Sequence, residues 1–156
     1  VFIVFIPLLI IPEYQNRLFS IWKIGGDADR FVYWDVATKM IRENPFLGKG
    51  IGTFMDHFAR YTNIYPAYAH NCYLQIWAES GIFSLLSFII FIGAVLYSGI
   101  KKFLATKDFL LLGFISGLMG FLAHTLFDVD LYSLRLAMLF WVWVGLISAR
   151  IVQKEE

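Results

Sequence analysis

The chain has 156 residues, of which 59% are hydrophobic, 19% aromatic and 16% charged, and its formal net charge is +1. Soluble domains are nearer half apolar and about a quarter charged, so this composition argues against an ordinary water-soluble domain. The near-neutral charge gives no reason to expect a nucleic-acid partner, and the single cysteine, Cys72, excludes an internal disulfide.

The apolar residues gather in four segments. Residues 1–11 are too short to cross a bilayer, which takes about 20 helical residues, so we expect a truncated transmembrane helix in the C-terminal part of a larger protein. Residues 81–100, 109–127 and 131–148 each have spanning length, and in lipid their backbone groups must be paired within a helix. The predicted fold class is all-α: an integral membrane helical bundle, with three full transmembrane helices in residues 81–149 after the truncated one.

Basic residues in the short loops predict the orientation of the bundle. Three lysines follow the first full span, and the tail of residues 150–156 is also basic at its start, whereas the turn between the last two spans is acidic. The positive-inside rule makes the lysine loop and the tail cytoplasmic. Residues 12–80 then form a large extracytoplasmic loop, periplasmic or extracellular.

This loop is rich in aromatic residues, so we expect it to fold rather than to be disordered. The pattern predicts a capped helix over about residues 30–42, a glycine-rich turn over 48–52 and a short helix over 53–61. A third helix is predicted to start near His70 and to continue into the membrane, with Gly81 at the boundary.

Several stretches of the sequence resemble the O-antigen ligase and polymerase superfamily, namely residues 30–34, 43–54, 70–71 and 79–81. The ligases carry a histidine followed directly by Asn, Ser or Gln, and nine residues separate this pair from a glycine. His70, Asn71 and Gly81 match this spacing. Ser84 departs from the motif, where the ligases have Gly, Thr or Tyr. The resemblance covers nearly the whole chain but only the C-terminal part of a family member.

The resemblance implies a multi-pass glycosyltransferase of the bacterial inner (plasma) membrane that acts in surface polysaccharide biosynthesis, such as that of lipopolysaccharide. The donor is expected to be a glycan on undecaprenyl diphosphate. The acceptor is expected to be lipid A core or another glycan or protein. No nucleotide sugar, metal or other cofactor is expected.

Such a transfer requires a group that holds the diphosphate and a base that activates the acceptor hydroxyl. Arg30 is the candidate for the diphosphate, because a guanidinium can grip two oxygens at once; the alternative is an arginine that stacks on Trp34. His70 is the candidate base or acceptor-orienting group. The alternative for His70 is a helix-capping or core-packed side chain.

Eight further residues are candidates for substrate binding: Asn71, Arg42, Lys49, Arg60, Glu79, His124, Asp128 and Arg135. Asn71 either orients His70 or caps the next helix. Lys49 lies between glycines, where backbone N–H groups either cradle an anion or form a plain turn. Glu79 pairs with an arginine, acts in acid–base chemistry, or is a solvated or capping carboxylate.

The polar residues of the last two spans also leave alternatives open. His124 and Asp128 have helical spacing, so they either line the cavity of His70 or pair with each other. Arg135 snorkels outward, binds an anionic head group or pairs with the acidic turn. The three scattered histidines predict no metal site.

Two other functions remain open on the sequence alone. A membrane transporter component would use His124, Asp128 and Arg135 as an intramembrane path. An inactive structural fragment would use none of the candidate residues.

Overall fold

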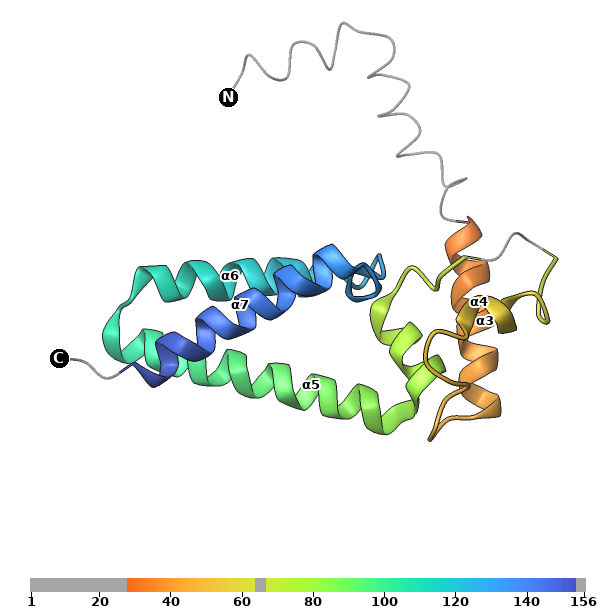
Figure 1. Cartoon of the computed structure of the whole chain (residues 1–156), viewed down its shortest axis with the longest axis horizontal. Coiled ribbons are helices and arrows are strands. Elements are labelled where there is room, and N and C mark those ends of the chain that lie inside the picture. The colour runs from red at the N-terminus through yellow and green to blue at the C-terminus, as the bar shows by residue number, and fades with distance from the viewer. Residues whose placement is uncertain (1–27, 64–66, 154–156) are drawn as a thin grey trace, which may run out of the picture.

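The computed structural model describes residues 28–63 and 67–153, and all regular structure in these residues is helical. The elements are α3 (Ala28–Glu43), α4 (Phe54–Phe58), α5 (Cys72–Thr106), α6 (Phe109–His124), the short 3₁₀ helix η1 (Asp130–Tyr132) and α7 (Leu134–Val152) (Figure 1). The prediction of an all-α protein is confirmed for this part of the chain. The predicted truncated helix at residues 1–11 lies outside the described residues.

The helices α5, α6 and α7 lie side by side as a bundle (Figure 1). Helices α5 and α7 are long and apolar enough to cross a membrane, with mean hydropathies of 2.2 and 1.6, and only 17% of each apolar window is buried inside the protein. A core helix of a soluble protein would be mostly buried, so these outward apolar faces favour contact with lipid. The side chains between the helices form a continuous core of Ile92, Leu111, Ile115, Leu118, Phe121, Phe140, Val144 and Ile147.

Helix α6 is shorter than the sequence predicts. It ends at His124 rather than at residue 127, and its 16 residues span about 24 Å, less than the roughly 30 Å of a hydrocarbon core. The chain turns at Thr125, whose carbonyl oxygen accepts the N–H of Cys72 at 2.9 Å. The described residues therefore contain two helices of full spanning length and one shorter apolar helix, not the three full spans predicted.

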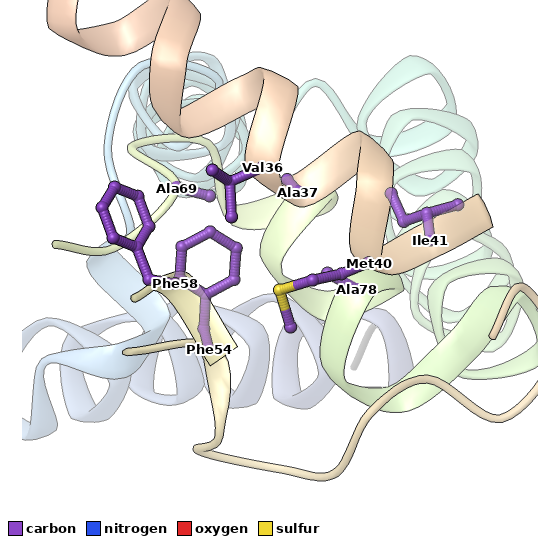
Figure 2. Close-up of a cluster of buried hydrophobic side chains, with 8 residues drawn as sticks. All are labelled: Val36, Ala37, Met40, Ile41, Phe54, Phe58, Ala69 and Ala78. Carbon is purple, nitrogen blue, oxygen red and sulfur yellow. The ribbon is translucent and has the colours of Figure 1, made fainter. Parts of the chain in front are cut away.

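A second layer lies across one end of the bundle and contains α3, α4 and the start of α5 (Figure 1). We call this end the polar end, and we call the second layer the polar layer. The layer has its own hydrophobic core, in which side chains from α3 meet two phenylalanines of α4 (Figure 2): Val36, Ala37, Met40, Ile41, Phe54, Phe58, Ala69 and Ala78. The predicted helix over residues 30–42 is confirmed as α3, whereas α4 is shorter than its predicted 53–61.

The two layers are joined at a break in α5. Gly81 has φ 81° and ψ 174°, so it leaves the helical conformation, and α5 changes direction there (Figure 1). Residues 72–80 belong to the polar layer, and residues 82–106 belong to the bundle. A Cβ added to Gly81 would lie 2.0 Å from the carbonyl oxygen of Phe46, so both the dihedral angle and the packing require glycine.

The loop of residues 44–53, between α3 and α4, supplies hydrogen-bond partners for this break. A helix end leaves carbonyl groups without partners inside the helix. Here the N–H of Lys49 donates to the carbonyl oxygen of Ala78, and the N–H of Gly50 donates to that of Glu79, each at 2.9 Å. The predicted glycine-rich turn thus forms the C-terminal cap of residues 72–80.

The same loop also pairs donors on the other side of the break. The N–H of Ile82 and the indole N–H of Trp77 both donate to the carbonyl oxygen of Pro45, each at 3.0 Å. Gly48 permits the close approach, because a Cβ on it would lie 2.3 Å from the backbone of Glu79. The helix that was predicted to continue past Gly81 is therefore broken there, at a corner built from two distant segments of the chain.

We expect Gly81→Ala to lower the free energy of unfolding by about 2 kcal/mol or more, because the new methyl group clashes with backbone and the dihedral angle is strained. Thermal unfolding in detergent micelles would measure the loss. Gly113→Ala in α6 is the matched control, since no described atom lies within 4 Å of its added Cβ. Equal unfolding midpoints for the two variants would contradict the proposed role of Gly81.

Candidate functional site

His70 lies immediately before α5, at the polar end of the bundle. It has a positive φ of 46°, and the next residue, Asn71, caps α5 by accepting the N–H of Leu74 on its side-chain oxygen at 3.0 Å. Of the two predicted roles of Asn71, the structure shows the cap. This cap fixes the point at which the helix starts and leaves His70 just outside it.

Three parts of the chain meet at His70. Its Nδ1 lies 3.4 Å from Oδ1 of Asp128 in the turn after α6, and the two side chains are 36% and 48% exposed. The ring of Tyr33 from α3 lies 5.4 Å from the His70 ring, between centroids. The imidazole is thus held by a carboxylate and an aromatic ring while part of it stays open to solvent.

Arg30 lies at the same end of the polar layer. It belongs to the first turn of α3 and precedes Tyr33 by three residues, and side chains at this helical spacing are neighbours. Because Tyr33 contacts His70, the predicted base lies beside the N-terminal half of α3, the helix that also carries Arg30.

The two aspartates of the acidic turn pair with different histidines. His124 Nδ1 lies 2.6 Å from Oδ2 of Asp130, and Asp128 pairs with His70 instead. The predicted pairing of His124 with Asp128 is wrong because α6 ends at His124, so the helical spacing does not continue. The structure therefore brings Asp128 to His70. The His124 side chain pairs with the buried Asp130 and is itself 65% exposed.

A depression of about 210 Å³ lies beside the His70–Asp128 pair, lined by Tyr68, Asp128, Val129, Asp130, Tyr132, Ser133 and Leu136. The rings of Tyr68 and Tyr132 lie 6.1 Å apart along it. Burial and the nearby Glu79 carboxylate raise the pKa of Tyr132, so its phenol stays protonated. The depression therefore offers aromatic faces together with carboxylate acceptors.

Glu79 is 1% exposed and anchors the corner. Its Oε1 accepts the N–H of Phe54 and the side-chain N–H of Gln75, each at 3.0 Å, and its Oε2 accepts the N–H of Gly52 at 3.0 Å and the hydroxyl of Tyr132 at 2.8 Å. Four donors satisfy both oxygens. Glu79 is thus a buried carboxylate that caps the first turn of α4, and it is not solvated.

Gln75 and Tyr132 were not predicted from the sequence. Gln75 precedes Glu79 by four residues in α5, which places both side chains on one helix face and is a signal that was available. Tyr132 had no such signal, because it reaches Glu79 across a long sequence separation.

Lys49 does not join the His70 site. Its ammonium group lies 2.5 Å from Glu43, and hydrogen bonding to Lys49 lowers the pKa of that carboxyl group. The N–H groups of Lys49 and Gly50 already donate to α5. The plain turn is therefore what the structure shows, and the predicted anion cradle is occupied by protein.

The other predicted cations are also spread out. Arg42 is exposed in the last turn of α3, about 18 Å from Arg30 along the helix axis. Arg60 is exposed after α4, and Arg135 is exposed in the first turn of α7. Within residues 28–63 and 67–153, no group of three or more His, Cys, Asp or Glu side chains is placed to hold a metal ion.

A family model described as O-antigen ligase matches residues 1–89 of the chain. The chain therefore belongs to the O-antigen ligase family, which confirms the resemblance found in its motifs. The family and the apolar helices together indicate a membrane protein. No curated protein and no solved structure matches the chain. The matched residues contain Arg30, His70 and Glu79, whereas Asp128 lies beyond them.

We expect Glu79→Gln to lower the free energy of unfolding by about 1–3 kcal/mol, because the amide nitrogen cannot accept the donors that the carboxylate accepts. Thermal unfolding and proteolysis of residues 44–53 would both report the loss. Glu43→Gln is the control, since Glu43 is exposed and pairs with Lys49; equal effects of the two substitutions would argue against the anchor.

Proposed function

We propose that this member of the O-antigen ligase family is a membrane glycosyltransferase that moves a glycan from undecaprenyl diphosphate to an acceptor hydroxyl. The family match supports the class of reaction. The observation that carries the site is the approach of His70 to Asp128 and Tyr33 at one polar end of an apolar bundle; Arg30 precedes Tyr33 by three residues in α3. A carrier lipid in the bilayer presents its diphosphate at such an end.

His70 is the proposed general base. With its Nδ1 facing Asp128, the carboxylate favours the tautomer that carries a proton on Nδ1, which leaves Nε2 free to accept one. The acceptor hydroxyl gives its proton to Nε2 while its oxygen bonds to the anomeric carbon of the donor sugar. The bond from that carbon to the diphosphate oxygen breaks, and undecaprenyl diphosphate leaves. Asp128 stabilises the imidazolium ion that forms.

Arg30 is the proposed ligand of the diphosphate. Negative charge grows on the leaving diphosphate as the sugar departs, and a guanidinium placed beforehand stabilises that charge with two hydrogen bonds. The depression beside Asp128, with Tyr68 and Tyr132, is the proposed place for the acceptor sugar or protein. Lipid A core, another glycan or a protein would each supply the hydroxyl.

The proposed orientation follows from charge at the other end of the bundle. Lys101 and Lys102 lie near the C-terminal end of α5, Lys107 caps that helix, and Arg150 lies in the last turn of α7. These ends of α5 and α7 lie away from the polar layer (Figure 1). The positive-inside rule makes that end cytoplasmic. The polar layer then faces the periplasm or the cell exterior, on the outer face of the inner membrane.

A transporter is less well supported. His124, Asp128 and Arg135 lie at the ends of α6 and α7 and in the turn between them, whereas an intramembrane path needs polar groups along the depth of the bundle.

We expect His70→Ala to reduce glycan transfer by about 10²–10⁴-fold, the usual contribution of a general base. Arg30→Ala should reduce it by about 10²–10³-fold, as loss of one charge-stabilising group does. Transfer from a lipid-linked donor in proteoliposomes, together with the surface glycan of intact cells, would measure both. Lys39→Ala is the control, an exposed cation on the same helix that pairs with Asp35. Normal transfer by His70→Ala would remove the proposed base.

The orientation has its own test. Asp35→Cys on the exposed side of α3 should react with a membrane-impermeant maleimide in intact cells, and Lys107→Cys should react only after permeabilisation. The native Cys72 is buried and contributes little background. The reverse pattern would place the polar layer in the cytoplasm, and the proposed reaction would lose its substrate.

A further inference from the structure

The loop of residues 44–53 carries a large apolar surface. Its side chains Phe46, Leu47 and Ile51 are 62%, 82% and 83% exposed. Scattered exposed apolar residues are ordinary, but several highly exposed ones on one short loop indicate an interaction surface. We call these three residues the apolar loop patch.

The patch continues into the outward surface of a spanning helix. The ring of Phe46 stacks on the ring of Phe83, with centroids 6.1 Å apart. Phe83 is 61% exposed and begins the apolar surface of α5 that Ile89 and Ile90 extend. A membrane-spanning α5 exposes this surface to lipid. Through Phe46, the patch lies directly beside it.

The length of α5 sets the depth of the patch. Lys101 ends the apolar run of α5 and so marks one membrane interface. A hydrocarbon core of about 30 Å takes about 20 helical residues, which brings the opposite boundary close to Gly81. Phe46, stacked on Phe83, therefore lies at the boundary between head groups and acyl chains.

Several backbone N–H groups in and beside the loop have hydrogen-bond partners within the protein. An unpaired N–H group in lipid costs several kcal/mol, and the residues around the patch pair six such groups inside the protein: Gly48 to Asn44, Lys49 to Ala78, Gly50 to Glu79, Thr53 to Gly50, and Gly52 and Phe54 to the Glu79 carboxylate. The charge of Lys49 is paired with Glu43. These six N–H groups therefore need no partner from water when the loop contacts lipid.

We propose that the apolar loop patch inserts into the lipid leaflet at the polar end of the bundle. The loop is then a second attachment of the polar layer to the membrane, beside the spanning helices. Because residues 44–53 also cap the corner in α5, lipid contact and the direction of residues 72–80 are fixed by one element. The interface resembles that of a monotopic anchor, where apolar side chains lie a few ångströms below the head groups.

Depth-dependent quenching tests this proposal in the complete protein, reconstituted in phosphatidylcholine–phosphatidylglycerol vesicles. Leu47→Cys and, as control, Asp35→Cys would each be labelled with the fluorophore NBD. Leu47 should be quenched several-fold more than Asp35 by a lipid that carries a spin label near the head group. Aqueous cobalt(II) should show the reverse order.

Two results would overturn the proposal. Equal, strong quenching of both positions by cobalt(II) would place the loop in water. Protection of Leu47 from both quenchers would mean that protein, not lipid, covers the patch. Ile51→Cys is a second probe if Leu47→Cys fails to reconstitute. Neither result depends on glycan transfer, so this proposal and the proposed function can fail separately.

Discussion

The corner at Gly81 is the constraint on which the rest of the structure depends. A chain that leaves an apolar bundle and turns across its end must break its helix, and the break releases backbone groups that need partners. The loop of residues 44–53 supplies them through the carbonyl of Pro45 and the N–H groups of Lys49 and Gly50. Two segments far apart in the sequence thereby become one rigid joint, and α3 is held across the end of the bundle because its C-terminus leads into that joint.

The residues that suggested the family divide into two kinds when the joint is considered. Gly48, Gly81 and Glu79 build the corner, where a Cβ would clash or where a carboxylate meets four donors. Arg30 and His70 lie outside the corner, and the His70 side chain is 36% exposed. Stretches that resemble one family in sequence therefore include residues that build the corner.

The sequence predicted those features that depend on local pattern. Apolar runs predicted α5 and α7, whereas Gly81 was predicted only as the membrane boundary of a continuous helix and not as a break. The prediction failed where a partner comes from elsewhere in the chain: α6 ends at His124, next to Thr125, whose carbonyl oxygen accepts the N–H of Cys72. Asp128 pairs with His70 and not with His124, so of the two predicted alternatives the pairing within one helix was wrong. For Glu79 the sequence left a solvated and a capping carboxylate open, and the structure shows the cap, with donors from Gly52 and Phe54 that have no local signature.

The corner and the site are joined by one buried network. Gln75 accepts the N–H of Ala69 on Oε1 at 2.8 Å and donates to Glu79 at 3.0 Å, and both side chains are almost fully buried. Ala69 directly precedes His70, whose positive φ needs support from its surroundings. Glu79 also holds Tyr132, which lines the depression beside the site. The buried carboxylate therefore positions the imidazole from one side and the depression from the other, so the geometry of His70 follows from the same hydrogen bonds that close the corner.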